Sequence, residues 1–297
     1  MKIERIYIAG HKADWRFTQC CVASIRHWYP KIPITLIKDE SGGDYSTEQL
    51  ETYWNVDCFR TPRKLFGFGF GKLEPLFLPA KERCLILDSD IVFVGRVLDT
   101  LENYDEDFIV ADGASPPEEQ PLHYYNIGKL NELDADFQNS NFTFNSGQIV
   151  ATTGILKRAD FEPVIDFSEP PSLRYPAIFA PSEQGVLNYV LLKKFQQGKI
   201  SLRRVPFMWW AGWLDEKAVN VRSLKKDSPH PFLVHWAGPE KKHSTCTFDT
   251  IRNGHLLRHF ESVYYSRIRN GPLEEKASPW RRIANVAADL RRRWSVS

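Results

Sequence analysis

Two aspartates, one residue apart, stand where a buried strand is expected to end. Asp88 and Asp90 follow the apolar run 84–87 and precede a second apolar run, 91–94. Four apolar residues bounded by charged ones are typical of a strand buried on both faces. Residues i and i+2 of an extended chain point the same way, so the two carboxylates leave the sheet edge as a pair. Because charges are costly out of water, the pair favours a hard divalent metal that also holds phosphate oxygens.

The same Asp-x-Asp spacing occurs twice more, at 105–107 and 134–136. The triplet at 105–107 is typical of a solvated turn, and the triplet at 134–136 lies in a polar region with no strand before it. Only the triplet at 88–90 lies between two strand-type runs. Its context, rather than its spacing, therefore predicts metal binding there. The alternative is an acidic turn at a strand end.

Strand and helix patterns alternate along the chain. The expected strands are 5–10, 34–37, 56–59, 84–87, 107–112, 144–151 and 232–236, and the expected helices are 15–29, 46–54 and 181–198. This alternation predicts an α/β fold with a mostly parallel, Rossmann-like sheet and helices on both faces. Ligands of such sheets bind beyond the carboxyl ends of the strands. Gly10, His11 and the aspartate pair all fall there.

Other candidate residues have ordinary structural alternatives. The glycine-rich stretch 65–72 lacks the spacing of a P-loop, and it could equally be an aromatic-packed loop before a helix, but Lys72 is a candidate phosphate ligand. His235 ends a strand and is followed by the basic stretch 241–243, which favours an anionic ligand over a merely hydrogen-bonded histidine. The long polar stretch 113–143 is expected to be a lid or binding loop.

Three tryptophans fall within five residues, at Trp209, Trp210 and Trp213. Core packing explains such a cluster as well as a binding role does. Flat aromatic rings near a loop glycine also suit the apolar faces of sugar rings. The cluster is therefore a candidate acceptor site.

Length and composition restrict the class of protein. The 297 residues allow two domains, or one large domain with an appendage, and 42% of them are hydrophobic, which is ample for a packed core. A net charge of +2 gives no case for nucleic-acid binding. The odd number of cysteines, five without a C-x-x-C pair, favours free thiols in a reducing compartment. With no signal peptide and no transmembrane run expected, the sequence predicts a cytoplasmic protein.

The carboxyl-terminal stretch differs in kind, and we expect residues 1–245 to form the main domain and 246–297 a helical, basic and aromatic segment. From position 276 onward there are six Lys or Arg against one Asp. One helical stripe carries Trp280, Ile283, Ala287, Leu290 and Trp294. A basic amphipathic helix predicts attachment to an anionic membrane surface, at the inner face of the membrane. The alternative is a helix docked on its own domain or on a partner.

Four short motifs occur in the order found in one enzyme family. They are Leu87-Asp88-Ser89-Asp90, Phe144-Asn145-Ser146-Gly147, Glu183-Gln184 and His235-x-x-Gly238-x-x-Lys241. On these motifs the chain resembles the nucleotide-sugar-dependent glycosyltransferases of GT-A fold, closest to family 8, the group of glycogenin and bacterial lipopolysaccharide galactosyltransferases. The resemblance spans residues 3 to 243. It implies transfer of a sugar, from a UDP-linked donor, to a glycan or glycolipid acceptor.

The resemblance also implies roles for individual residues. Manganese or magnesium would be held by Asp88, Asp90 and His235. The donor would be bound by Ala9, Gly10 and His11 at the nucleobase, by Gly238 and Lys241 at the diphosphate, by Lys72 at a phosphate or the sugar, and by Asn145 at the sugar. Ser89 would also contact the donor. The catalytic candidates lining that sugar are Asp112, Glu183 and Gln184, with Gln184 near the reacting face. Trp209 and Trp210 are the candidates for the acceptor. The family's retention of configuration at the anomeric carbon is implied as well.

Two departures from the family pattern limit what can be carried over. Lys242-His243 replaces Pro-Trp, and Glu183 stands where aspartate is usual. The extra methylene of the glutamate would shift a sugar contact, so the identity of the donor sugar does not follow from the resemblance.

Three other classes compete with this interpretation. A phosphatase with Asp88 as nucleophile would carry the motif on an early strand followed by small residues. A sugar-phosphate nucleotidyltransferase would need a glycine-rich and basic loop after the first strand, and residues 9–14 are a poor match. A non-catalytic carbohydrate- or nucleotide-binding protein on the same fold would not need the full set of metal and phosphate residues, and turnover distinguishes it.

Overall fold

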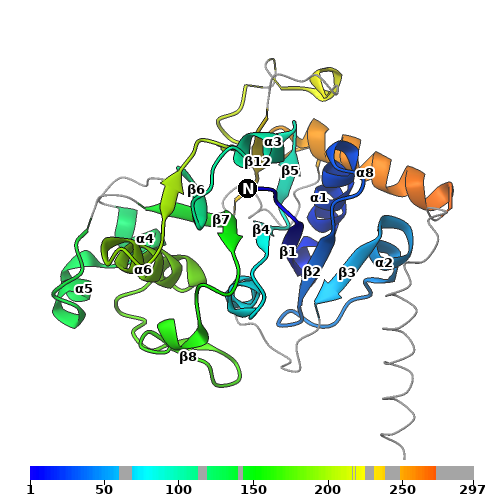
Figure 1. The fold of residues 1–297 in the computed structure, drawn as a ribbon. Coiled ribbons are helices and arrows are strands. Elements are labelled where there is room, and N and C mark those ends of the chain that lie inside the picture. The colour runs from blue at the N-terminus through cyan, green and yellow to red at the C-terminus, as the bar shows by residue number, and fades with distance from the viewer. Residues whose placement is uncertain are drawn as a thin grey trace, which may run out of the picture.

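The computed structural model describes residues 1–59, 69–112, 119–139, 143–215, 217, 219–224, 231–237 and 248–271, and for Asp112 it describes only the backbone. A central mixed sheet organises this fold. Within these residues seven strands lie in the order β10-β6-β7-β4-β1-β2-β3 (Figure 1). Their bounds are β1 (Arg5–His11), β2 (Ile34–Asp39), β3 (Val56–Phe59), β4 (Arg83–Asp88), β6 (Phe108–Asp112), β7 (Phe144–Thr152) and β10 (Leu202–Arg204). The predicted α/β fold with a mainly parallel sheet is confirmed.

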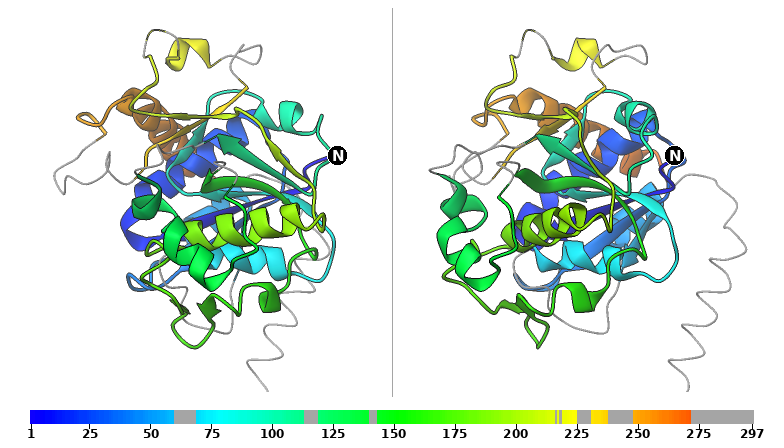
Figure 2. Two further views of the ribbon diagram at one scale, coloured as in Figure 1. Left: turned by 90° about the vertical axis from the view of Figure 1, so that its left-hand side faces the viewer. Right: turned by 60° about the vertical axis from the view of Figure 1, so that its left-hand side comes forward.

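Helices cover both faces of this sheet (Figure 2). The described α-helices are α1 (Trp15–Trp28), α2 (Glu48–Trp54), α3 (Val97–Leu101), α4 (Gln120–His123), α5 (Ile127–Leu133), α6 (Glu183–Gln196) and α8 (Gly254–Arg269). A 3-10 helix, η2, runs over Phe70–Phe77. The first two helices and the first three strands lie within two residues of their predicted bounds.

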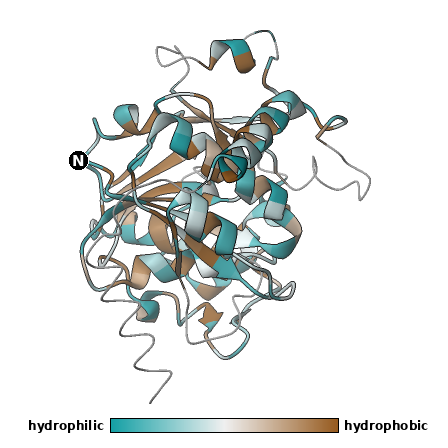
Figure 3. Ribbon diagram, turned by 90° about the vertical axis from the view of Figure 1, so that its right-hand side faces the viewer, coloured by the Kyte–Doolittle hydropathy of each residue, from teal (hydrophilic) through white to brown (hydrophobic). Residues whose placement is uncertain are grey.

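Two hydrophobic cores lie on opposite faces of the sheet, because successive strand residues point to opposite sides. On β1, Ile6 and Ile8 pack in the core with α1 and α8, whereas Tyr7 packs in the core with η2 and α6. On β4, Leu87 packs in the core with α1 and α8, and Ile86 packs in the core with η2 and α6. In Figure 3 the central strands are accordingly mostly brown. This double burial explains why the strand runs are continuously apolar.

One strand, β7, runs against the others. It pairs antiparallel with both β4 and β6, whereas β1, β2, β3 and β4 are mutually parallel. The sequence did not predict this reversal. Its consequence is that the start of β7, residues 144–147, comes to the edge where β1, β2 and β4 end. The polar head of β7 thus joins the polar ends of the parallel strands.

A small second sheet lies beside that edge. It consists of β11 (Met208–Trp210), β12 (Leu233–His235) and β5 (Ile91–Phe93), with β12 in the middle. The strand β12 is parallel to β11 and antiparallel to β5. Because β5 begins immediately after Asp90, this sheet brings the end of β12 to the aspartate pair. A short hairpin of β8 (Ile165–Asp166) and β9 (Ser172–Leu173) lies elsewhere.

The helix α8 packs on α1 in the first core. Arg16 of α1 donates to Glu261 of α8 at 2.7 Å, and the rings of Trp54 and Tyr264 stack at 5.2 Å. The predicted boundary at 245/246 remains a prediction, and the predicted tail helix lies outside the described residues. None of the described helices has the length and apolar character to cross a bilayer.

Candidate active site

Asp88 and Asp90 flank Ser89 in the turn between β4 and β5. Ser89 and Asp90 are buried, whereas the side chain of Asp88 is 30% exposed. The backbone N–H of Trp236 donates to the carbonyl of Asp90 at 3.0 Å. The turn is therefore fastened to the residue that follows β12.

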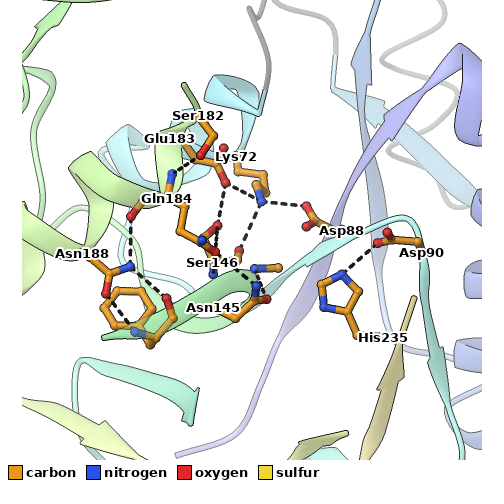
Figure 4. A network of polar contacts seen from close by, with 12 residues as sticks. Lys72, Asp88, Asp90, Asn145, Ser146, Ser182, Glu183, Gln184, Asn188 and His235 are labelled. Atoms are coloured by element: carbon orange, nitrogen blue, oxygen red, sulfur yellow. Dashed lines mark hydrogen bonds and ion pairs between the residues drawn. The ribbon is translucent and has the colours of Figure 1, made fainter. Parts of the chain in front are cut away.

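His235 reaches the aspartate pair from β12. It lies opposite Ile91 in the antiparallel pairing, and its Nε2 is 3.2 Å from Oδ1 of Asp90 (Figure 4). Asp88, Asp90 and His235 each offer one ligand atom, and these atoms lie within 4.8 Å of one another. Two carboxylate oxygens and one imidazole nitrogen form a donor set that can hold a divalent metal ion. The structure thus brings His235 to two aspartates that are distant from it in the sequence.

Gly147 keeps space free beside this group. A Cβ built on Gly147 would lie 2.5 Å from Cε1 of His235 and 3.0 Å from Oδ2 of Asp88, both too close for a real side chain. Any larger residue would push two of the three candidate ligands. The glycine therefore leaves the side chains of His235 and Asp88 in their places.

Lys72 lies between two carboxylates. Its Nζ is 2.7 Å from Oδ1 of Asp88 and 2.5 Å from Oε1 of Glu183, and it donates to the carbonyl of Ser146 at 3.3 Å (Figure 4). Burial alone would lower the pKa of this ammonium, but the charges of Asp88 and Glu183 outweigh burial and raise its pKa. Lys72 is thus a fixed cation bound to Asp88, and its predicted contact with the donor remains a prediction.

Glu183 opens helix α6 and is buried. Ser182 is the N-cap, with its Oγ accepting from the N–H of Gln184 at 3.2 Å. Gly69 approaches the carboxylate closely: a Cβ there would lie 2.0 Å from Oε2 of Glu183, and its φ of +83° favours glycine. The helix start and this glycine together fix where Glu183 meets Lys72.

Gln184 is held to the head of β7. Its Oε1 accepts from Nδ2 of Asn145 at 3.1 Å and from the N–H of Ser146 at 3.0 Å, and its Nε2 donates to the carbonyl of His123 at 3.0 Å. Ser146 Oγ donates to Glu183 at 2.8 Å. The hydrogen bonds of Figure 4 thus join η2, β7 and α6 into one network ending at Asp88.

Asn188, one turn further along α6, holds the same strand. Its Nδ2 donates to the carbonyl of Phe144, and its Oδ1 accepts from the N–H of Phe144, both at 2.9 Å. This residue escaped the sequence analysis. An asparagine four residues after Gln184 on a helix cannot be recognised as functional from the sequence, because the sequence does not show which strand faces the helix.

A cavity of about 420 Å³ opens over these residues. Nine of the predicted site residues line it, namely Ala9, Gly10, His11, Lys72, Asp88, Ser89, Asp90, Glu183 and Gln184. The lining residues that sequence analysis missed are Asp14, Asp39, Ser41, Gly69, Ser146 and Ser182. Asp39 could have been found, because it ends the strand parallel to β1 and such ends share one sheet edge. Residues predicted from separate motifs therefore line the same cavity.

Trp209 and Trp210 lie on opposite faces of β11, and Trp213 lies in the turn after it. Trp210 pairs in register with His235, and their rings stack at 5.1 Å. Trp209 points to the opposite face, as alternate strand residues do, and packs against Phe232. Trp213, 78% exposed, lies edge-on to Trp210 at 6.5 Å. Of the two predicted acceptor residues, only Trp210 therefore shares the face of His235.

Three predicted positions are not described to the level of their side chains. Gly238 and Lys241 lie outside the described residues, and so does the side chain of Asp112, whose backbone ends β6. Their predicted roles remain predictions.

No protein-family model matches the sequence, and no curated protein matches it. Solved structures do resemble the chain in fold. The glycosyltransferase GlyE of Streptococcus pneumoniae TIGR4 aligns over 93% of this chain at TM-score 0.53 and 14% identity, and the chain spans 66% of GlyE. The galactosyltransferase LgtC, solved with donor and acceptor sugar analogs, aligns over 93% at TM-score 0.53 and 13% identity, with 99% of LgtC covered.

The bifunctional glycosyltransferase WbbM also aligns, over 92% of this chain at TM-score 0.54 and 12% identity, with 50% of WbbM covered. At such identities these likenesses establish the fold. The chain has the fold of the family-8-like, GT-A glycosyltransferases that the sequence motifs predict.

Proposed function

We propose that the protein is a metal-dependent glycosyltransferase that moves a sugar from a nucleotide-sugar donor, a UDP-sugar, to a glycan or glycolipid acceptor with retention at the anomeric carbon. The observation that carries the proposal is the meeting of Asp88, Asp90 and His235 beside the cavity at the carboxyl ends of β1, β2 and β4. The likeness in fold to solved glycosyltransferases supports it.

Asp88, Asp90 and His235 would hold Mn²⁺ or Mg²⁺, and the bound ion would supply positive charge where negative charge develops on the departing nucleoside diphosphate. Lys72 serves this site indirectly, because its ion pair fixes one oxygen of Asp88. The ends of β1 and β2 would receive the nucleoside, since Ala9, Gly10 and His11 line the cavity there.

Gln184 and Glu183 orient the donor sugar in this proposal. The Gln184 carbonyl already accepts from Asn145 and Ser146, so its lone pairs are engaged. Glu183 is likewise engaged, by Lys72 and Ser146. Neither group is a free nucleophile in this arrangement, and both shape the wall of the cavity. Trp210 and Trp213 would contact the acceptor.

The experiment is a turnover assay with a panel of UDP-sugars, with and without Mn²⁺, that measures released UDP. A parallel assay with UTP and sugar 1-phosphates measures released pyrophosphate. The proposal predicts Mn²⁺-dependent UDP release, faster with acceptor. Asp90→Asn should reduce it by a hundredfold or more, since metal ligands stabilise the transition state by several kcal/mol. Asp136→Asn, at an exposed position of the Asp-x-Asp triplet 134–136, is the matched control and should retain wild-type rates.

Pyrophosphate release from UTP and a sugar 1-phosphate would instead indicate a nucleotidyltransferase. Binding of UDP-sugars without any turnover would indicate a binding protein. Full UDP release by Asp90→Asn would contradict the proposed metal site.

A further inference from the structure

Trp210 is placed against His235 by the pairing of two strands. The strands β11 and β12 are parallel and put Trp210 in register with His235. The two rings lie 5.1 Å apart with an interplanar angle of 25°, and the N–H of Ala211 donates to the carbonyl of His235 at 2.9 Å. The indole therefore covers one face of the imidazole, and the backbone beside it is tied to the same residue.

Among the described residues, none gives the imidazole the hydrogen bond that ordinarily orients a metal-binding histidine. Its Nε2 faces Asp90 at 3.2 Å, whereas its Nδ1 is buried and has no hydrogen-bond partner among the described residues. Histidine ligands usually donate their second ring nitrogen to a carboxylate, a carbonyl or water, and this bond fixes the ring plane. For His235 the described structure offers ring stacking instead.

The backbone that carries the indole is fixed by hydrogen bonds. The N–H groups of Trp213 and Leu214 donate to the carbonyl of Trp210 at 3.0 and 3.2 Å, which closes a turn. Buried Asn253 donates to the carbonyls of Ala211 and Leu214 at 2.7 and 3.0 Å, which anchors that turn to the start of α8. Hydrogen bonds thus fix the turn that follows the stacked ring.

We infer that Trp210 is a positioning residue for the metal site: its ring fixes the plane of the His235 imidazole so that Nε2 points at the place shared with Asp88 and Asp90. The inference rests on the metal site of the proposed function. Loss of a group that orients a metal ligand typically weakens metal binding by 10- to 100-fold. The indole should contribute an effect at the lower end of that range, because stacking restrains a ring less sharply than a hydrogen bond.

The first test is Mn²⁺ affinity, measured on the full chain by electron paramagnetic resonance of free Mn²⁺. Trp210→Leu should raise the dissociation constant roughly tenfold, and Trp210→Phe, which keeps a stacking ring, should stay within about threefold of wild type. Trp209→Leu removes an equally large ring from the other face of the same strand and should leave the Mn²⁺ affinity unchanged. Rescue by phenylalanine separates ring stacking from mere filling of space.

The second test is the NMR signal of His235 in the metal-free protein, with ¹³C-labelled histidine and His235→Gln for assignment. A ring stacked on indole has its C–H protons shifted upfield, so Trp210→Leu should move the His235 signals downfield while leaving other histidine signals in place. This readout needs neither metal nor turnover.

The outcomes distinguish the two claims. Unchanged Mn²⁺ affinity in Trp210→Leu, in a protein that binds Mn²⁺ through Asp90, would overturn the positioning role alone. Absence of Mn²⁺ binding by the wild-type protein would overturn the metal site of the proposed function and the positioning role with it. An unshifted His235 signal in the wild-type protein would show that the rings are not stacked and would also overturn the inference.

Discussion

Lys72 Nζ lies 2.7 Å from Oδ1 of Asp88, so a candidate metal ligand is also one end of a buried ion pair. The same ammonium binds Glu183, and the side chain of Lys72 is 6% exposed. One cation therefore offsets two carboxylates at the wall of the cavity. The contribution of these ion pairs to folding stability can therefore be measured separately from the metal binding of Asp88.

Removal of this cation should destabilise the fold. Lys72→Met would leave buried Glu183 without its cation, and breaking a buried pair by deleting one partner costs about 3 kcal/mol or more. Urea denaturation should show this loss, whereas Lys199→Met, at an exposed position, should change stability by less than about 0.5 kcal/mol. Lys72→Met/Glu183→Gln should recover part of the loss. Equal stability of Lys72→Met and wild type would show that the pair contributes nothing.

Gly147 should be intolerant of even one added methyl group. In Gly147→Ala the new Cβ would press on the ring of His235 and on Oδ1 of Asn145, which lies 2.6 Å from the ideal Cβ position. We expect Mn²⁺ affinity to fall at least tenfold, as for other displaced ligand shells. Gly128→Ala, whose Cβ would meet only an ordinary contact at 3.5 Å, is the control. Isothermal titration with Mn²⁺ measures both, and wild-type affinity in Gly147→Ala would refute the close approach.

The interface of α1 and α8 should respond to acid. Burial lowers the pKa of His259, and the nearby charge of His27 lowers it further. The folded state therefore binds fewer protons than the unfolded chain, and stability should fall as pH drops from about 7 through the ordinary histidine pKa of 6.5. Because His259 is only half-buried, we expect an effect below about 1 kcal/mol. Thermal melts at pH 7.5 and 5.5 should show a smaller acid shift for His259→Gln than for wild type. An identical shift would exclude this histidine as the cause.

The basic stretch after position 276 should bind anionic lipid. Truncation after Ala277 removes five arginines and both tryptophans of the predicted helix. Near an anionic surface each basic residue contributes about 1 kcal/mol, so sedimentation with phosphatidylserine-rich vesicles should be lost in the truncated chain. UDP release from a UDP-sugar should persist. Co-sedimentation of both forms to the same extent would contradict membrane attachment.

The sequence predicts the fold well where the apolar pattern is local. Val56–Phe59 and Ile34–Ile37 are recognisable as strands because each is a short segment of three apolar residues and one polar residue. Asn55 and Arg60 bound the first segment, and Pro33 and Lys38 bound the second. The reversed direction of β7 could not be read, because strand direction depends on the path of the connection and not on the side-chain pattern. For the same reason, the pairing of β5 with β12 could not be predicted from the sequence.

The same distinction between local patterns and long-range contacts applies to the candidate site. Asp88 and Asp90 are recognisable because one short stretch carries the strand, the turn and both acids. The pattern of the sequence marks His235 as a strand-end histidine, but only the family resemblance makes it a metal ligand. Its position beside Asp90 depends on strand pairing across 145 residues. The Lys72–Glu183 pair and the clamp of Asn188 on Phe144 could not be predicted, because each depends on which face of a helix meets β7.

The most direct measurement of the central claim is a crystal of the protein soaked with Mn²⁺ and UDP, recorded at a wavelength where manganese scatters anomalously. The account predicts one strong anomalous peak within about 2.5 Å of a carboxylate oxygen of Asp88 and of Asp90 and of Nε2 of His235, with the diphosphate on its open side. A peak elsewhere, or none at these three residues while UDP occupies the cavity, would contradict it.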